Sequence, residues 1–171
     1  MENIRSFENL TPQLGENVYV ADTALVIGDV ILGDESSVWF HSVLRADINN
    51  IRIGKRTNIQ DNCVLHVDFD TYSVDIGDEV TIGHNATIHG CTIESRVLIG
   101  MGAIVLSGST IETGAIVAAG AVVRENQVVP TRTLVAGVPA KPVRKITDEE
   151  FDTIVSSAQH YVDYGSRYLS H

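Results

Sequence analysis

Residues 82–123 read IGHNATIHGCTIESRVLIGMGAIVLSGSTIETGAIVAAGAVV, and in this stretch a Val or Ile returns at almost every sixth position. A small residue stands four places after most of these positions, as Ala86 does after Ile82 and Ala103 after Ile99. A period of six fits neither the turn of an α-helix nor the alternation of a single strand. It is typical of a solenoid in which three short strands make one triangular coil.

The same period covers most of the chain. Counted from Val20, the aliphatic positions are Val20, Val26, Leu32, Val38, Leu44, Ile53, Ile59, Leu65, Ile76, Ile82, Ile88, Ile93, Ile99, Val105, Ile111, Val117 and Val123. Every third member of this series falls on the same face, which predicts three interior columns that begin at Val20, Val26 and Leu32. Neighbouring coils should lie about 4.8 Å apart, as hydrogen-bonded strands do.

The period is broken at three places. Three residues are inserted before Ile53, five are inserted before Ile76, and one is missing before Ile93. All three breaks fall at the corner between the second and third columns, in neighbouring coils. A cluster of loops at one edge of a regular scaffold indicates the rim of a functional site.

The repeat predicts the organisation of the chain. We expect an N-terminal extension over residues 1–19, a repeat β-helix over residues 20–128, a connector over residues 129–146 and a C-terminal helix over residues 147–171. The fold class is therefore an all-β solenoid, a parallel β-helix with one appended α-helix.

The C-terminal segment carries its own helix signals. Thr147 and Glu150 have the spacing of a capping box. The apolar residues that follow have the spacing of one buried stripe. They are Phe151, Ile154, Val155, Ala158, Tyr161 and Val162.

Composition excludes several classes of protein. The formal net charge of −10 argues against nucleic acid or an anionic membrane as the main partner. The start of the chain lacks the features of a signal peptide, and no apolar run is long enough to span a membrane. Cys63 and Cys91 are too far apart for a CxxC motif, so a disulfide framework is not expected. These features favour a soluble cytoplasmic protein.

Three of the six histidines fall at informative positions on the coil. His66 directly follows Leu65 and His89 directly follows Ile88, so the two histidines should stack one coil apart at the corner that carries the breaks. His84 stands two places after Ile82, at a different corner. A single histidine of this kind would be read as an ordinary corner residue. Because one chain offers two converging imidazoles and a third that lies elsewhere, a three-ligand site requires a second copy, and a threefold oligomer would supply it.

Three neutral imidazoles with the fourth position left to water form the catalytic zinc arrangement of carbonic anhydrases. Fe²⁺ and Co²⁺ also accept three imidazoles. Cys63 occupies an inward position and reads as core, whereas Cys91 lies near His89 and is either a bystander or a further ligand.

Other polar residues lie at the same two corners. Gln60 and Asp61 follow Ile59, which places Asp61 one coil beneath His84, where a carboxylate can orient an imidazole. Arg45 and Asp47 lie beneath the edge that carries His66. These four residues are read either as support for a metal site or as an ion-pair network at an interface between subunits, and the two readings are compatible.

The segments LRADI (44–48), RTNIQDN (56–62), LHV (65–67) and IGHNATIHGC (82–91) resemble the gamma-class carbonic anhydrases and their hexapeptide-repeat relatives. The resemblance covers essentially the whole chain. It implies a trimer of left-handed β-helices with zinc or iron bound between subunits. It assigns the metal to His66 and His89 of one subunit and to His84 of its neighbour.

The resemblance also assigns supporting residues. Arg45 and Asp61 would pair across the interface with support from Asp47 and Asn58, Gln60 would position the attacking water, and Tyr161 would lie near the active site.

The chain departs from the family pattern in its proton-transfer residues. Ile48 stands where active members carry a glutamate, and the loop VDFDTYSVD (67–75) is short. Proton removal is needed in every turnover, so hydration should be weak unless Asp68, Asp70 or Tyr72 takes over this role.

The sequence thus favours a lyase, a gamma-class carbonic anhydrase-like enzyme that interconverts carbon dioxide and bicarbonate. Two alternatives stay open. One is a hexapeptide-repeat acyltransferase that uses a coenzyme A thioester and an interfacial histidine as base. The other is a metal-binding scaffold protein without catalysis.

Overall fold

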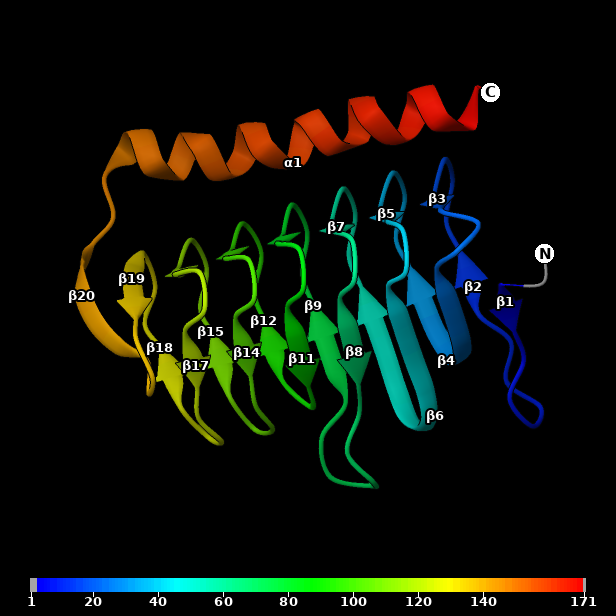
Figure 1. Ribbon diagram of the computed structural model, residues 1–171, viewed down its shortest axis with the longest axis horizontal. Helices are drawn as coiled ribbons and strands as arrows, with labels where there is room; N and C mark the ends of the chain where they lie inside the picture. The colour runs from blue at the N-terminus through cyan, green and yellow to red at the C-terminus, as the bar shows by residue number, and fades with distance from the viewer. Residues whose placement is uncertain (1–2, 171) are drawn as a thin grey trace.

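The computed structural model describes residues 3–170 as a parallel β-solenoid with one long helix along its side (Figure 1). The strands fall on three faces that meet at three corners. The first face holds β3 (Tyr19–Val20), β5 (Ser37–Val38), β7 (Asn58–Ile59), β10 (Thr81–Ile82), β13 (Leu98–Ile99), β16 (Ile116–Val117) and β19 (Thr133–Ala136). Each strand of this face pairs in parallel with the next one.

The other two faces share two long strands, β4 (Leu25–Leu32) and β6 (Val43–Ile53), which turn the corner without interruption. The second face continues with β8 (Val64–His66), β11 (Thr87–His89), β14 (Ile104–Val105) and β17 (Val122–Val123). The third face continues with β9 (Val74–Ile76), β12 (Thr92–Ile93), β15 (Thr110–Ile111) and β18 (Val128–Val129). The short strands β1 (Ile4–Arg5) and β2 (Gln13–Leu14) pair with β4.

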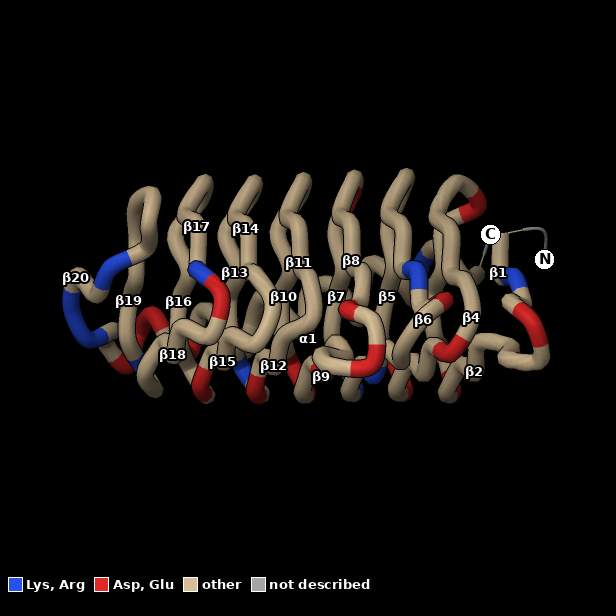
Figure 2. The backbone as a smooth tube through the Cα atoms, turned by 90° about the horizontal axis from the view of Figure 1, so that it is seen from below, with Lys and Arg blue, Asp and Glu red and all other residues tan. Residues whose placement is uncertain are grey.

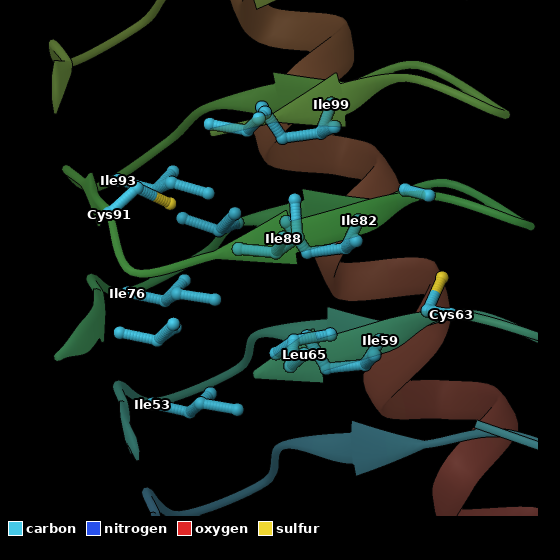
Figure 3. Packing of buried hydrophobic residues seen from close by; sticks show 14 of the residues in the cluster. Ile53, Ile59, Cys63, Leu65, Ile76, Ile82, Ile88, Cys91, Ile93 and Ile99 are labelled. Atoms are coloured by element: carbon cyan, nitrogen blue, oxygen red, sulfur yellow. The ribbon is translucent and has the colours of Figure 1, made fainter. Parts of the chain in front are cut away.

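The three predicted interior columns are confirmed by the strand registers. Val20 pairs with Val38 on the first face, Leu44 with Leu65 on the second and Ile76 with Ile93 on the third. All of the aliphatic positions in the series are buried except Val20, which lies in the first coil and is partly covered. Figure 3 shows the aliphatic side chains of successive coils stacked in this interior.

The breaks in the period have different structural outcomes. The insertion before Ile53 was interpreted as a loop, but it lies within β6, where a register shift between Gly28 and Val30 of β4 absorbs the difference in length. The insertion before Ile76 forms a projecting loop between β8 and β9, and Figure 2 shows its acidic residues. One protruding loop therefore stands at this corner instead of a cluster.

The ladder is longer at both ends than the repeat expected over residues 20–128. At the start, β1 and β2 extend the sheet from within the first 19 residues. At the end, β19 continues the parallel ladder, and β20 (Lys141–Lys145) pairs antiparallel with it inside the expected connector. Figure 2 shows the basic residues of β20 at this end of the solenoid.

The helix α1 (Asp148–Leu169) runs back along the solenoid towards its first coils (Figure 1). The predicted capping box is confirmed, because Thr147 Oγ1 accepts from Glu150 N while Thr147 N donates to the Glu150 carboxylate. Its buried residues are Ile154, Ala158 and Gly165, and it contacts β3, β5, β7 and β10 of the first face. The side chains near the C-terminal end of the helix therefore lie against the first three coils. Over residues 3–170, no helix has the length and apolar character needed to cross a membrane.

Candidate metal centre

His66 and His89 lie side by side on the second face. They end strands β8 and β11, and the register pairs His66 with His89 on one side and with Arg45 on the other, as the period predicted. The side chains converge, with His66 Nδ1 3.2 Å from His89 Nε2 and the ring centroids 5.2 Å apart. The outward alternation of a strand thus places two imidazoles next to each other.

The outer nitrogen of each ring has its own partner. His66 Nε2 lies 3.1 Å from Asp47 Oδ1, and His89 Nδ1 lies 2.9 Å from Ser107 Oγ. When each of these outer nitrogens donates, the two inner nitrogens present lone pairs to each other, and a shared cation satisfies both. Two nitrogens bound to one tetrahedral zinc ion at 2.0–2.1 Å lie about 3.3 Å apart. The observed separation therefore suits two ligands of one ion.

The pKa shifts of His66 and Asp47 favour the forms of these side chains that support metal binding. Burial lowers the pKa of His66 below its ordinary value, although the hydrogen bond to Asp47 acts in the opposite direction. Burial raises the pKa of Asp47, but its hydrogen bonds to Arg45 and His66 outweigh that effect and hold the pKa below its ordinary value. Arg45, whose Nη1 lies 2.5 Å from Asp47 Oδ2, contributes more to the low pKa of Asp47 than His66 does. A neutral imidazole is the form that binds a metal.

His84 lies at the corner between the first and second faces, on the opposite edge of the second face. This corner turns through left-handed residues at Asn62 and Asn85, each with φ of 60°, a conformation that asparagine tolerates. His84 Nδ1 lies 2.8 Å from Asp61 Oδ2 in the coil beneath it, which leaves His84 Nε2 as the outward nitrogen. About a third of the His84 side chain is exposed, so the imidazole faces away from the core.

One chain does not bring the three predicted ligands together. Within residues 3–170, no group of three or more His, Cys, Asp or Glu side chains is arranged to hold a metal ion. Arg45 and Asp61 likewise lie at different corners, and the ion pairs they make within the chain are with Asp47 and His84. The candidate residues thus fall into two groups, one at each edge of the second face.

The residues beside His84 form an ordered hydrogen-bond chain. Gln60 Oε1 accepts from the backbone N–H of His84 at 3.2 Å, and Gln60 Nε2 donates to Asn58 Oδ1 at 3.2 Å. Asn58 Nδ2 in turn donates to Thr81 Oγ1 at 2.9 Å. Gln60 is only 5% exposed and Asn58 only 1%, so these bonds fix the orientation of both amides.

Tyr161 lies on α1 near this corner. Its ring packs 5.4 Å from the ring of Trp39, and burial followed by the charge of Asp61 raises the pKa of its hydroxyl. The tyrosine therefore remains a neutral hydroxyl near His84 and Asp61.

Both cysteines lie in the interior. Cys63 is fully buried and Cys91 is 2% exposed, and Figure 3 shows Cys91 beside Ile93 within the coil. Burial raises the pKa of Cys63 to about 11 and that of Cys91 to about 12. Cys91 is therefore a core residue in this chain, with its thiol protonated.

Two features of the site escaped the sequence reasoning. Ser107 was not singled out, although it stands 18 residues after His89 and therefore one coil above it. The packing of Trp39 against Tyr161 and Tyr168 was also missed, because a contact between the first coils and the end of the chain leaves no periodic signal.

Residues 90–125 match the family described as bacterial transferase hexapeptide (six repeats). The chain is 54% identical over 149 residues to the "Probable carbonic anhydrase" of Methanocaldococcus jannaschii, a match that covers 87% of this chain and 93% of the relative. It is 46% identical over 165 residues to gamma carbonic anhydrase 2, mitochondrial, of Arabidopsis thaliana, covering 94% of this chain and 59% of the relative. A crystal structure of a hexapeptide transferase family protein from Anaplasma phagocytophilum superimposes with a TM-score of 0.93 at 35% identity, covering 98% of this chain and 99% of that one. The chain belongs to the gamma-class carbonic anhydrase-like family of hexapeptide-repeat proteins.

Proposed function

We propose that this protein catalyses the reversible, metal-dependent hydration of carbon dioxide to bicarbonate at a three-histidine site shared between two copies of the chain in a homotrimer. The observation that carries the proposal is the pair of ring nitrogens of His66 and His89, 3.2 Å apart, each backed by a partner on its other nitrogen. The two relatives named as carbonic anhydrases support the same reaction.

The donor set fits a divalent cation. His66 and His89 of one copy and His84 of the next would hold the metal, which we propose to be zinc, with Fe²⁺ or Co²⁺ as alternatives. When bound, such a metal acts as a Lewis acid that lowers the pKa of water from 15.7 to about 7. Ser107 and Asp61 would fix the ring orientations of His89 and His84, the role that outer partners of metal ligands have.

The other polar residues would position substrate and close the interface. Gln60 has its amide fixed by the backbone of His84 and by Asn58, so it would direct the attacking water. Arg45 has 45% of its side chain exposed and lies beside Asp47, from where it would reach Asp61 of the adjacent copy. Tyr161, held as a neutral hydroxyl, would donate a hydrogen bond to the developing bicarbonate.

Proton removal is the step that we expect to limit turnover. Ile48 offers no carboxylate, and the residues of the 67–73 loop are partly engaged elsewhere. Tyr72 donates its hydroxyl to Asn126 at 3.1 Å, and Asp68 Oδ1 accepts from Phe69 N at 3.0 Å. Asp70 is then the one carboxylate of this loop left to accept the proton. If proton removal limits turnover, an added imidazole buffer should raise the rate by accepting the proton in place of a side chain.

A transferase remains the second candidate, because both the matched repeat family and the superimposable structure carry that description. An acyltransferase needs one histidine as general base, whereas hydration needs three as ligands. Metal content separates the two readings, and a metal-loaded trimer without hydratase activity at any buffer concentration would favour the scaffold reading.

The deciding experiment is complementation between inactive chains. His66→Ala and His84→Ala should each lose most of the bound zinc and of the hydration rate, while His160→Ala, which removes an exposed histidine of α1, should lose neither. Refolding the two inactive chains together should restore part of both, because some interfaces then combine intact half-sites. Failure of the mixture to regain zinc would refute a site shared between copies.

A further inference from the structure

The loop between β8 and β9 carries an aromatic residue that its own chain does not cover. Phe69 is 65% exposed, more than any other aromatic residue within residues 3–170. Two carboxylates flank it, those of Asp68 and Asp70. Asp68 Oδ1 accepts from Phe69 N at 3.0 Å, whereas in the described part of the chain the Asp70 side chain has no hydrogen bond or ion pair. The tip of the loop thus presents one ring and one unpaired carboxylate.

The loop itself is held in place by hydrogen bonds. Asn49 Nδ2 donates to the carbonyl of Asp68 at 3.1 Å, and Asp68 N donates to the carbonyl of Tyr72 at 2.9 Å. The Tyr72 hydroxyl donates to Asn126 Oδ1 at 3.1 Å, and its ring lies so close to Gly108 that a Cβ added there would come within 2.9 Å of ring carbon Cζ. A loop that is already fixed can bind a partner without a large loss of conformational entropy.

A hollow of matching character lies where the last turns of α1 meet the first coils. It has a volume of about 410 Å³, and we call it the aromatic pocket. It is lined by Trp39, Phe40, Asp61, Tyr161, Tyr164, Arg167 and Tyr168. Trp39 is buried beneath the other rings, whereas Tyr164 and Tyr168 are about half exposed at the opening.

The two charged residues of the aromatic pocket differ in their partners. Asp61 holds His84 at 2.8 Å. Arg167 approaches the Tyr164 ring at 5.8 Å, and over residues 3–170 no carboxylate pairs with it. The opening of the pocket therefore offers exposed ring edges and one exposed cation, which complement the ring and the carboxylate at the tip of the loop.

The loop and the aromatic pocket of one chain lie on opposite sides of the solenoid (Figure 1). The loop leaves the corner between the second and third faces, which is the corner opposite the first face. The helix α1 covers the first face. Phe69 therefore does not reach the pocket of its own chain, and a second copy is needed to bring the two together.

The shared metal site supplies that arrangement. It requires the corner that carries His66 in one copy to meet the corner that carries His84 in the next. Because the loop points away from its own first face, at this meeting point it extends over the first face of the next copy, beside the end of α1. Phe69 stands three residues after His66, and Asp61 of the pocket contacts His84, so the loop and the pocket are both next to the shared site.

The heights along the solenoid also agree. His84 and His89 belong to the same coil, so a threefold axis that joins them runs parallel to the solenoid and keeps equal coils of the three copies at equal height. The loop lies in the same coil as Asp61, and Trp39 lies one coil before it. The loop of one copy therefore stands level with the aromatic pocket of the next.

We propose that Phe69 of each copy inserts into the aromatic pocket of the next copy, where Asp70 pairs with Arg167 at the rim. The proposal rests on the proposed function, from which it takes the meeting of His66 with His84. The contact would make the loop a wall of the shared site on the side of Tyr161. It would also engage the one free carboxylate of the loop, in keeping with turnover that is limited by proton removal.

A disulfide between copies tests the contact directly. The variant with both Asp70→Cys and Arg167→Cys should form covalent trimers under mild oxidation, seen on a denaturing gel without reductant. The native thiols of Cys63 and Cys91 are buried and should not interfere. The control combines Val128→Cys with Arg167→Cys, since Val128 is exposed on the third face, and it should stay monomeric on the gel.

Substitutions measure what the contact contributes to the trimer. Phe69→Ala should raise the dissociation constant of the trimer at least about tenfold, as the loss of an aromatic anchor does. Val128→Ala, which trims an exposed side chain of the third face, should leave it unchanged. The constant would be measured by light scattering over a dilution series at a fixed, sub-denaturing concentration of urea.

Exchange of the two charges tests the rim. Asp70→Arg and Arg167→Asp should each raise the dissociation constant about two- to fivefold, the range of an exposed ion pair. A chain that carries both substitutions should recover most of the wild-type value. Equal weakening in the single and double variants would overturn the pairing of Asp70 with Arg167.

Zinc content and oligomeric state, measured on the same samples, separate this proposal from the proposed function. A zinc-loaded trimer that neither crosslinks between positions 70 and 167 nor weakens in Phe69→Ala would overturn the contact and leave the proposed function standing. Crosslinking without any effect of Phe69→Ala would overturn the insertion of the ring. A wild-type chain that is monomeric and binds no zinc would overturn both proposals.

Discussion

Replacing Ser107 by alanine tests the assignment of His89 as a ligand without touching a ligand. Ser107 Oγ lies 2.9 Å from His89 Nδ1, and His89 Nε2 faces His66 at 3.2 Å. The serine therefore fixes the ring orientation, and as an acceptor it favours the proton on Nδ1, which leaves Nε2 free for a metal. Loss of such an outer partner typically costs about 10- to 100-fold in metal affinity, which corresponds to about 1.4–2.7 kcal/mol. We expect a decrease in zinc affinity within this range.

The assay is a competition titration of the oligomer against a chromophoric chelator at constant pH, because proton release makes metal affinity depend on pH. Ser95→Ala is the matched control, since it removes a corner serine that accepts from Asp78 N at 3.0 Å, far from the histidines in the coil. It should lower the free energy of unfolding by about 1 kcal/mol and leave zinc affinity unchanged. A Ser107→Ala variant with wild-type zinc affinity would refute the assignment of His89 Nε2 as a metal ligand oriented by Ser107.

Further predictions follow from the shuttle position, the helix cap, the core and the thiols. Ile48→Glu should raise the rate of carbon dioxide hydration at low buffer concentration and change it less at high imidazole concentration, as measured by stopped flow. An equal gain in rate at both concentrations would contradict proton removal as the rate-limiting step. The Arg144 side chain and the capping hydrogen bond hold the pKa of Glu150 at about 2, below its unfolded value of about 4.5. This stabilisation is complete above the unfolded pKa and is lost as the pH falls towards 2. In Glu150→Gln the loss of helix stability at low pH should therefore be smaller than in wild type, as followed by circular dichroism of the two proteins. Ile99→Ala should lower the free energy of unfolding by about 2–5 kcal/mol in denaturant titrations, because the side chain is fully buried; a loss well below this range would mean that the coil collapses around the cavity. Cys63, with its pKa raised to about 11, should react with iodoacetamide only after unfolding, and rapid labelling of the native protein would contradict its burial.

The columns of the core could be predicted from the sequence because the repeat is local. Each coil contributes one aliphatic residue per face, and parallel pairing then fixes which residues meet. Ile82 lies between Ile59 and Ile99 for this reason alone. The same six-residue period predicted that His66 lies beside His89 and that Asp61 lies beneath His84, and contacts in the structure confirm both positions.

The features that the sequence did not predict depend on contacts that do not recur with the six-residue repeat. The three residues inserted before Ile53 could form either a loop or a longer strand, and the sequence does not distinguish the two. The pairing of β6 with β4 in the structure shows that they form a strand. Gly165 is buried where α1 lies against Tyr19 and Ser37, whereas a hydropathy pattern gives glycine no weight. Whether His84 of one copy meets His66 and His89 of another would be decided by contacts between copies, and no pattern within one chain encodes that distance.

The return of α1 along the solenoid affects the order in which the protein can be completed during synthesis. The C-terminal end of α1 lies beside the first coils (Figure 1), and Tyr168 in its last turn packs on Trp39 and Tyr19. The first coils leave the ribosome long before this aromatic cover exists, so the nascent solenoid must carry an uncovered Trp39 until α1 has been synthesised. A stop codon anywhere before α1 would leave that apolar patch permanently open to water. For this chain, synthesis of α1 is therefore a condition for covering the coils that were made first.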